Sequence, residues 1–195
     1  MRWCLQERGI SNIDRVWIKK QRLKLIHRHI ANGAIGPSTL RKQGARGVAK
    51  AARKFLRKLN ISKLTEKQAN EYRSWLDKKT DGLMKRFPKG AKKNWGAARK
   101  AINLLMFAAY FNKVLLREYK LDKFKDVLET PLDGIAAKKL REFARKNLNL
   151  RLRFPGIKNL TPQVNEQFQK VASTYARQKG IRRAELDTIL WPSRV

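Results

Sequence analysis

The stretch that decides the fold reads Ile102-Asn103-Leu104-Leu105-Met106-Phe107-Ala108-Ala109-Tyr110-Phe111. Apolar side chains occupy nearly every position, so a helix here would be apolar on almost every side. Such a helix is typical of the buried centre of a protein. The stretch is also too short to span a membrane, which takes about 20 apolar residues. It therefore predicts a buried central helix on which the other helices pack.

The rest of the chain shows the apolar spacing of amphipathic helices and no alternating pattern that would predict a strand. From Gly47 to Leu59, apolar residues recur at intervals of three and four. Thr130-Pro131 and Thr161-Pro162 each read as an N-cap followed by proline at the first helical position. A first helix is expected from about Ile13 to Ile30, with Val16 and Trp17 on its apolar side. We predict an all-α bundle of about seven to eight helices around the central one.

The length of 195 residues suits a single helical domain, 1–195. A division into two lobes would fall near residues 60–64. The basic N-terminal helices would then occupy 1–60 and the helical core 61–195. With one cysteine, Cys4, the chain can form neither an internal disulfide nor a cysteine-based metal site.

The charge of the chain is its strongest functional signal. It has 47 Lys and Arg against 15 Asp and Glu, a net charge of +32. Such an excess repels itself unless a polyanion shares the field. Nucleic acid is the expected partner because neutralised phosphates release counterions and add affinity without sequence specificity. We expect binding mainly through phosphates, with duplex DNA favoured over RNA, and a monomer in the absence of ligand.

The basic residues of the 47–59 helix lie on the face opposite its apolar one. No acid interrupts this face, whereas ordinary solvated faces mix signs. It is interpreted as a phosphate-contacting stripe, and a solvated polar face is the alternative. The predicted nucleic-acid contacts are Arg46, Lys50, Arg53, Lys54, Arg57, Lys58, Lys92, Lys93, Arg99, Arg182 and Arg183.

Several kinds of site have no support in the sequence. There is no Gly-rich phosphate loop and no GxGxxG, so no nucleotide cofactor is expected. His27 and His29 would fall on different sides of a helix and cannot pair as metal ligands there, so no metal is expected. No apolar run is long enough to cross a membrane, and Met1 to Gly9 lack an apolar stretch. The protein is expected to be intracellular, either cytoplasmic or nucleoid-associated.

Two short motifs resemble those of the helix-hairpin-helix DNA glycosylase superfamily. The first is Arg99-Lys100-x-x-Asn103, at the start of the central helix. The second is Pro131-Leu132-Asp133, at the start of a later one. The resemblance implies an enzyme of DNA repair, a glycosylase and abasic-site lyase, with Lys100 as nucleophile and Asp133 as the essential carboxylate. A lysine amine can form a Schiff base with the sugar of a flipped nucleotide.

Other interpretations of the same residues remain open. Lys100 could be a surface or phosphate-contacting lysine, and Asp133 could be the third residue of a capping box that begins at Thr130. The segment Lys54–Lys58, followed by Leu64-Thr65-Glu66 and a helix, resembles the core-binding domain of tyrosine recombinases, which clamps duplex DNA. The chain could also be a structural or packaging protein of a nucleoprotein particle, neutralising its nucleic acid.

Overall fold

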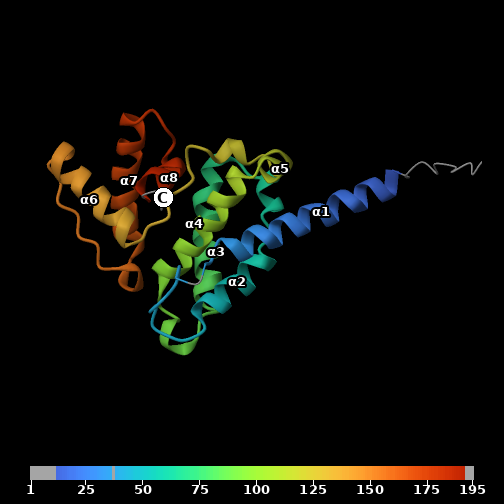
Figure 1. The fold of residues 1–195 in the computed structure, drawn as a ribbon, viewed down its shortest axis with the longest axis horizontal. Helices are drawn as coiled ribbons and strands as arrows, with labels where there is room; N and C mark the ends of the chain where they lie inside the picture. Colours follow the sequence, from blue (N-terminus) through green and yellow to red (C-terminus); the bar gives the residue numbers. More distant parts are fainter. Residues whose placement is uncertain (1–11, 37, 192–195) are drawn as a thin grey trace, which may run out of the picture.

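The computed structural model describes residues 12–36 and 38–191. These residues form eight α-helices, joined by short 3-10 turns, and no β-strand (Figure 1). The predicted all-α class is therefore confirmed. Cys4 and the residues from Met1 to Gly9 lie outside the described part. The helices are α1 Asn12–Gly33, α2 Val48–Lys58, α3 Tyr72–Met84, α4 Trp95–Phe111, α5 Lys113–Glu118, α6 Gly134–Leu148, α7 Pro162–Gln178 and α8 Leu186–Leu190.

Helix α4 is the central helix that the sequence predicts. It contacts α1, α2, α3 and α5, and the 3-10 turn η5 at Ile157–Asn159 packs against it. Ile102 and Leu105 are fully buried. The prediction of burial on all sides fails at the C-terminal end, where Phe111 is 47% exposed because the helix emerges from its neighbours. Phe111 packs instead against Phe107 in a tilted arrangement, with ring centroids 4.7 Å apart.

The described residues bury two clusters of apolar side chains. The first surrounds α4 and contains side chains from Ala31 to Leu128, together with Ala184. The second, from Leu132 to Leu190, joins α6, α7 and α8, which lie together on one side of the molecule in Figure 1. The predicted lobe boundary at 60–64 lies inside the first cluster.

The linker between the two clusters, residues 127–130, is held by the side chains of Gln169 and Arg183. Arg183 donates through Nε to the Leu128 carbonyl and through Nη2 to the Val127 carbonyl, both at 2.8 Å. The Gln169 amide pairs with the backbone of Thr130, accepting from its N–H at 3.0 Å and donating to its carbonyl at 2.9 Å. Buried backbone groups that lack regular secondary structure are thus satisfied by long side chains.

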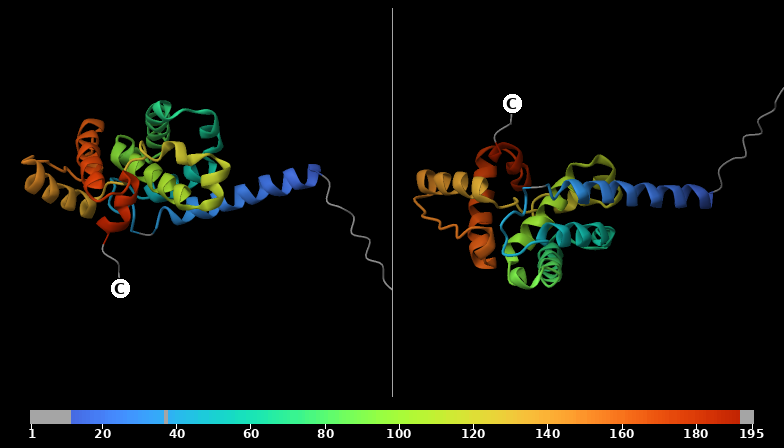
Figure 2. Two further views of the ribbon diagram at one scale, coloured as in Figure 1. Left: turned by 90° about the horizontal axis from the view of Figure 1, so that it is seen from above. Right: turned by 60° about the horizontal axis from the view of Figure 1, so that its bottom comes forward.

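Helix α1 extends beyond the rest of the molecule (Figures 1 and 2). Its C-terminal part packs on the first cluster through Leu23, Ile26 and Ile30. Toward its N-terminus, Ile13 is 81% and Trp17 61% exposed. The expected apolar side of this helix is therefore buried only over its last turns. None of the described helices is both long and apolar enough to cross a membrane.

Gly96, in the first turn of α4, lets the chain pass close to turn η5. A Cβ added at Gly96 would lie 2.2 Å from the Ile157 carbonyl oxygen and 2.7 Å from the Leu160 Cβ. We expect Gly96→Ala to lower the free energy of unfolding by about 3 kcal/mol, as for other overpacked sites. Urea denaturation measures the change. Gly134→Ala is the matched control, since nothing lies within 4 Å of its added Cβ, and an equal loss in both variants would contradict the prediction.

Candidate active site at the junction of the two cores

Lys100 and Asp133 lie side by side, although they are 33 residues apart and belong to different helices. The Lys100 Nζ is 3.2 Å from Asp133 Oδ2. The side chains are only 8% and 10% exposed. Lys100 comes from the first cluster's central helix, and Asp133 from the start of α6 in the second. The pair therefore spans the junction of the two cores.

The start of helix α6 fixes the position of the Asp133 carboxylate. Asp133 is the N-cap, and its Oδ1 accepts from the Ile135 and Ala136 N–H groups, each at 2.9 Å. This leaves Oδ2 free to accept from Lys100. The predicted N-cap at Thr130 is wrong, because the Thr130 hydroxyl donates to the Arg183 carbonyl at 2.6 Å instead. The interpretation of Asp133 as the third residue of a capping box is therefore also wrong, because Asp133 is itself the N-cap.

A pocket opens beside the Lys100–Asp133 pair. Its volume is about 470 Å³, within the usual range of roughly 300–1,000 Å³ for small-molecule sites. Its walls come from the loop before α2, from α4, from the start of α6, and from α8 and the residue that follows it. Polar groups from several of these elements converge on it. They are Ser38, Thr39, Arg41, Gln43, Lys100, Asp133 and Asp187.

Asp187 brings a second carboxyl group to this pocket. Burial raises its pKa from an ordinary 3.8 to about 6, and the charge of Asp133 adds to the rise, while Lys100 opposes it. A carboxyl group with such a pKa exchanges protons near neutral pH and can serve as a general acid or base. The pocket thus combines an amine, a capped carboxylate and a carboxyl group that is easily protonated.

Asp187 also predicts a pH-dependent stability. Because its folded pKa of about 6 lies above 3.8, the folded state binds the proton more tightly, so its contribution is present below pH 3.8 and is lost as the pH rises through 6. We expect Asp187→Asn to raise the free energy of unfolding at pH 8 by about 1–2 kcal/mol. This is less than the free energy that corresponds to the whole pKa shift, because the Asp187 side chain is partly exposed to solvent. The gain should vanish near pH 4.

Urea denaturation across this pH range tests the prediction. Asp126→Asn is the control because Asp126 is an exposed acid in the same protein. A gain in stability for Asp187→Asn that is the same at pH 4 and pH 8 would show that ionisation of the Asp187 carboxyl group does not destabilise the protein.

Arg99, a predicted phosphate contact, is instead buried and paired. Its side chain is 1% exposed. It donates to Glu129 through Nε at 3.0 Å and Nη2 at 3.1 Å, and to Asp77 at 2.7 Å. Asn103, the last residue of the Arg-Lys-x-x-Asn motif, also donates to Glu129, at 3.0 Å. Arg99 and Asn103 therefore belong to a buried network of hydrogen bonds around Glu129.

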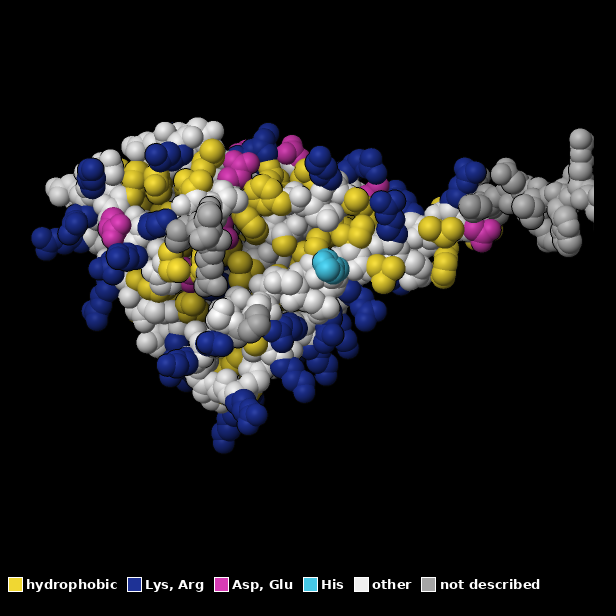
Figure 3. Space-filling model, viewed as in Figure 1, with side chains coloured by type: hydrophobic (Ala, Val, Ile, Leu, Met, Phe, Trp, Pro, Cys, Tyr) yellow, Lys and Arg dark blue, Asp and Glu magenta, His cyan; other side chains and the backbone are white. Residues whose placement is uncertain are grey.

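The remaining predicted contacts on α2 and around α4 are mostly at the surface. Arg53 is the exception, since its Nε donates to the Ile35 carbonyl at 2.9 Å and ties α2 to the loop after α1. Figure 3 shows Lys and Arg side chains crowding the edge of the molecule where α2 lies. The exposed predicted contacts are Arg46, Lys50, Lys54, Arg57, Lys58, Lys92 and Lys93.

The C-terminal arginine pair has other partners. Arg182 donates to the Tyr110 hydroxyl and lies 3.5 Å from Asp122. Arg183 donates to the linker carbonyls of Val127 and Leu128, and burial lowers its pKa. The guanidinium of Arg183, a predicted phosphate contact, is therefore engaged inside the protein, where it holds the linker.

Comparison with known proteins gives no match to a family model, to a curated protein or to a solved structure. Within residues 12–36 and 38–191, no group of three or more His, Cys, Asp and Glu side chains could hold a metal ion. Asp187 and the loop around Ser38 and Gln43 were missed from the sequence, since no local motif marks them. The candidate site is therefore defined by its geometry.

Proposed function

We propose that this protein is a DNA-binding enzyme that removes a base and cleaves the strand through a Schiff base on Lys100. The observation that carries the proposal is the Lys100–Asp133 pair, 3.2 Å apart at the wall of a pocket of about 470 Å³. The pair also occupies the two positions that resemble the glycosylase motifs. A buried amine beside a carboxylate and next to an open cavity is a suitable arrangement for covalent catalysis.

A flipped nucleotide is the substrate that suits this pocket. Enzymes that act on a base take it out of the stack and bind it by hydrogen bonds and stacking. Ser38 and Thr39 offer hydroxyl groups for hydrogen bonds, and the indole of Trp191 offers a surface for stacking. The exposed cations on α2 and before α4 would contact phosphates, which is consistent with the net charge of +32.

The reaction on an abasic site uses groups that the pocket provides. Lys100 first gives a proton to the Asp187 carboxylate, and its neutral amine attacks the C1′ aldehyde of the ring-opened sugar. The same proton then leaves with the hydroxyl group as water, which gives the protonated imine. A base then removes a proton from C2′, and the electrons of that C–H bond expel the 3′ phosphate. Asp133 stabilises the cationic nitrogen at 3.2 Å. Asp187 lies in the same pocket and can carry the proton.

Borohydride trapping tests this proposal. The reagent reduces the imine to a stable amine, so wild-type protein with duplex DNA carrying one abasic site should give a covalent adduct. Peptide mapping should place the adduct on Lys100, and Lys100→Ala should give none. Lys93→Ala is the matched control, because Lys93 is an exposed lysine close in the chain and its loss should leave the adduct unchanged.

A DNA-binding protein without catalysis is the second candidate. The observation that favours it is that Lys100 and Asp133 both have a structural role. Asp133 caps α6, and its ion pair with Lys100 joins the two cores. In that case wild-type protein gives no adduct at Lys100, and Lys100→Ala lowers the stability of the protein while DNA binding persists in the folded fraction.

A further inference from the structure

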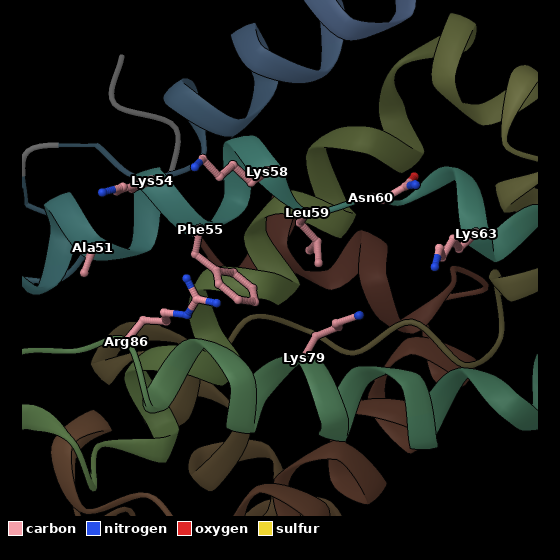
Figure 4. Close-up of a pocket in the computed structure, with 9 residues that line it drawn as sticks. All are labelled: Ala51, Lys54, Phe55, Lys58, Leu59, Asn60, Lys63, Lys79 and Arg86. Carbon is pink, nitrogen blue, oxygen red and sulfur yellow. The ribbon is translucent and has the colours of Figure 1, made fainter.

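A second pocket, lined by cations, lies between α2 and α3. Its volume is about 440 Å³. Figure 4 shows the residues that line it, which come from α2, from the segment after it, from α3 and from the segment after α3. We call it the basic pocket. Its charged residues are Lys54, Lys58, Lys63, Lys79 and Arg86.

The five cations of the basic pocket form no ion pair with an acid in the described part of the chain. No Asp or Glu is among the residues that line it, and the ion pairs of the described part of the chain, from Lys19–Glu118 to Arg182–Asp122, include none of the five. A concave surface lined by charges of one sign focuses the field and concentrates ions of the opposite sign. The basic pocket is therefore built to attract an anion.

The floor of the basic pocket is apolar. Phe55 lies between α2 and α3, and the guanidinium of Arg86 reaches toward its ring (Figure 4). The ring packs against α3 at Gly82, where an added Cβ would be 3.7 Å from the Phe55 Cζ. Ala51 and Leu59 complete the apolar surface. A ligand that fills the pocket therefore meets an aromatic side chain as well as positive charge.

We propose that the basic pocket binds an unpaired nucleotide of a DNA strand, with the phosphates on the cations and the base against Phe55. Sites for single strands combine a positively charged groove with aromatic side chains on which bases stack. The backbone of an intact duplex presents phosphates but keeps its base faces covered, so it would leave the aromatic floor unused. The choice of DNA over other nucleic acids rests on the proposed function. That the ligand is an unpaired nucleotide is inferred from the cations and the aromatic side chain of the pocket alone.

Fluorescence anisotropy with labelled octanucleotides tests this proposal. The probes are a single strand, an abasic octamer with the same phosphates and no bases, and a duplex of the same length. We expect the double variant Lys79→Glu/Arg86→Glu to bind the single strand at least 10-fold more weakly and to reduce the slope of log K against log salt concentration. The matched control is Lys138→Glu/Arg141→Glu on exposed positions of α6, with the same change in charge.

Phe55→Leu separates stacking from charge. It keeps an apolar floor but removes the aromatic face, so it should weaken binding of the single strand about 5-fold and leave the abasic octamer unchanged. Equal losses for the two charge-reversal pairs would overturn the proposal, and so would equal affinity of wild-type protein for the single strand and the abasic octamer.

The trapping experiment keeps this result distinct from the proposed function. Lys79→Glu/Arg86→Glu at saturating DNA should still give the adduct. If wild-type protein gives no adduct but the basic-pocket variants lose binding as described, the proposed function fails and the basic pocket stands.

Discussion

Strand cleavage at an abasic site is expected to fall by at least about 1,000-fold when Lys100 is replaced by alanine, since the covalent route then has no nucleophile. The Lys100 amine is the buried amine beside Asp133 in the pocket. The exposed lysines reach the solvent and cannot replace it at that position. Single-turnover rates on duplex DNA measure the effect.

Asp133→Asn refines this prediction. Asparagine is as good an N-cap as aspartate, so the start of α6 should keep its bonds to the Ile135 and Ala136 amides. The variant loses the charge that faces Lys100, and we expect the rate of the folded protein to fall about 100-fold. Because Lys100 is then left buried without its anion, the free energy of unfolding should fall as well. Rates within 10-fold of wild type for both Lys100→Ala and Asp133→Asn would remove this pair from the reaction.

The largest loss of stability is expected for Glu129→Gln. Glu129 Oε2 accepts from Arg99 Nε at 3.0 Å, from Asn103 Nδ2 at 3.0 Å and from Asn165 Nδ2 at 3.2 Å. Glutamine would bring an N–H group to face these donors and leave the buried Arg99 without its main anion. We expect the free energy of unfolding to fall by about 3–5 kcal/mol, as for other broken buried pairs.

Urea denaturation with a second substitution shows the origin of this loss. Adding Arg99→Met to Glu129→Gln should recover part of it, because the unpaired charge is then gone and Asp77, which is about half exposed, can be hydrated. Glu166→Gln is the control. Glu166 pairs with Lys170 at the surface, so we expect a change below about 0.5 kcal/mol. Equal effects for Glu129→Gln and Glu166→Gln would contradict this account of the core.

More of the fold than of the candidate site could be predicted from the sequence. Helix α4 was predictable because its apolar residues leave no polar face, and α7 because Thr161-Pro162 is a local signal that nothing distant overrides. The start of α6 was not, because Thr130 is engaged by Arg183, which lies 53 residues away. Contacts over such distances leave no mark on the neighbouring sequence.

Arg99 and Lys100 show why the roles of adjacent residues could not be separated. Both read as basic residues at the start of one helix, but successive helical residues point about 100° apart. Arg99 points to Asp77 and Glu129, 22 and 30 residues away, and Lys100 points to Asp133 and the pocket. The Lys100–Asp133 pair was reached only through the resemblance to glycosylase motifs, and Asp187 through neither route.

The linker between the two cores sets how the pocket beside Lys100 and Asp133 can admit a ligand. A hinge needs residues whose backbone angles change at low cost. Here Gln169 holds both backbone groups of Thr130, and Arg183 holds the two carbonyls before it. We therefore expect the cores to move as one body. The opening then keeps one shape. Under the proposed function, it would exclude a nucleotide of the wrong shape at the entrance and would not close around the right one.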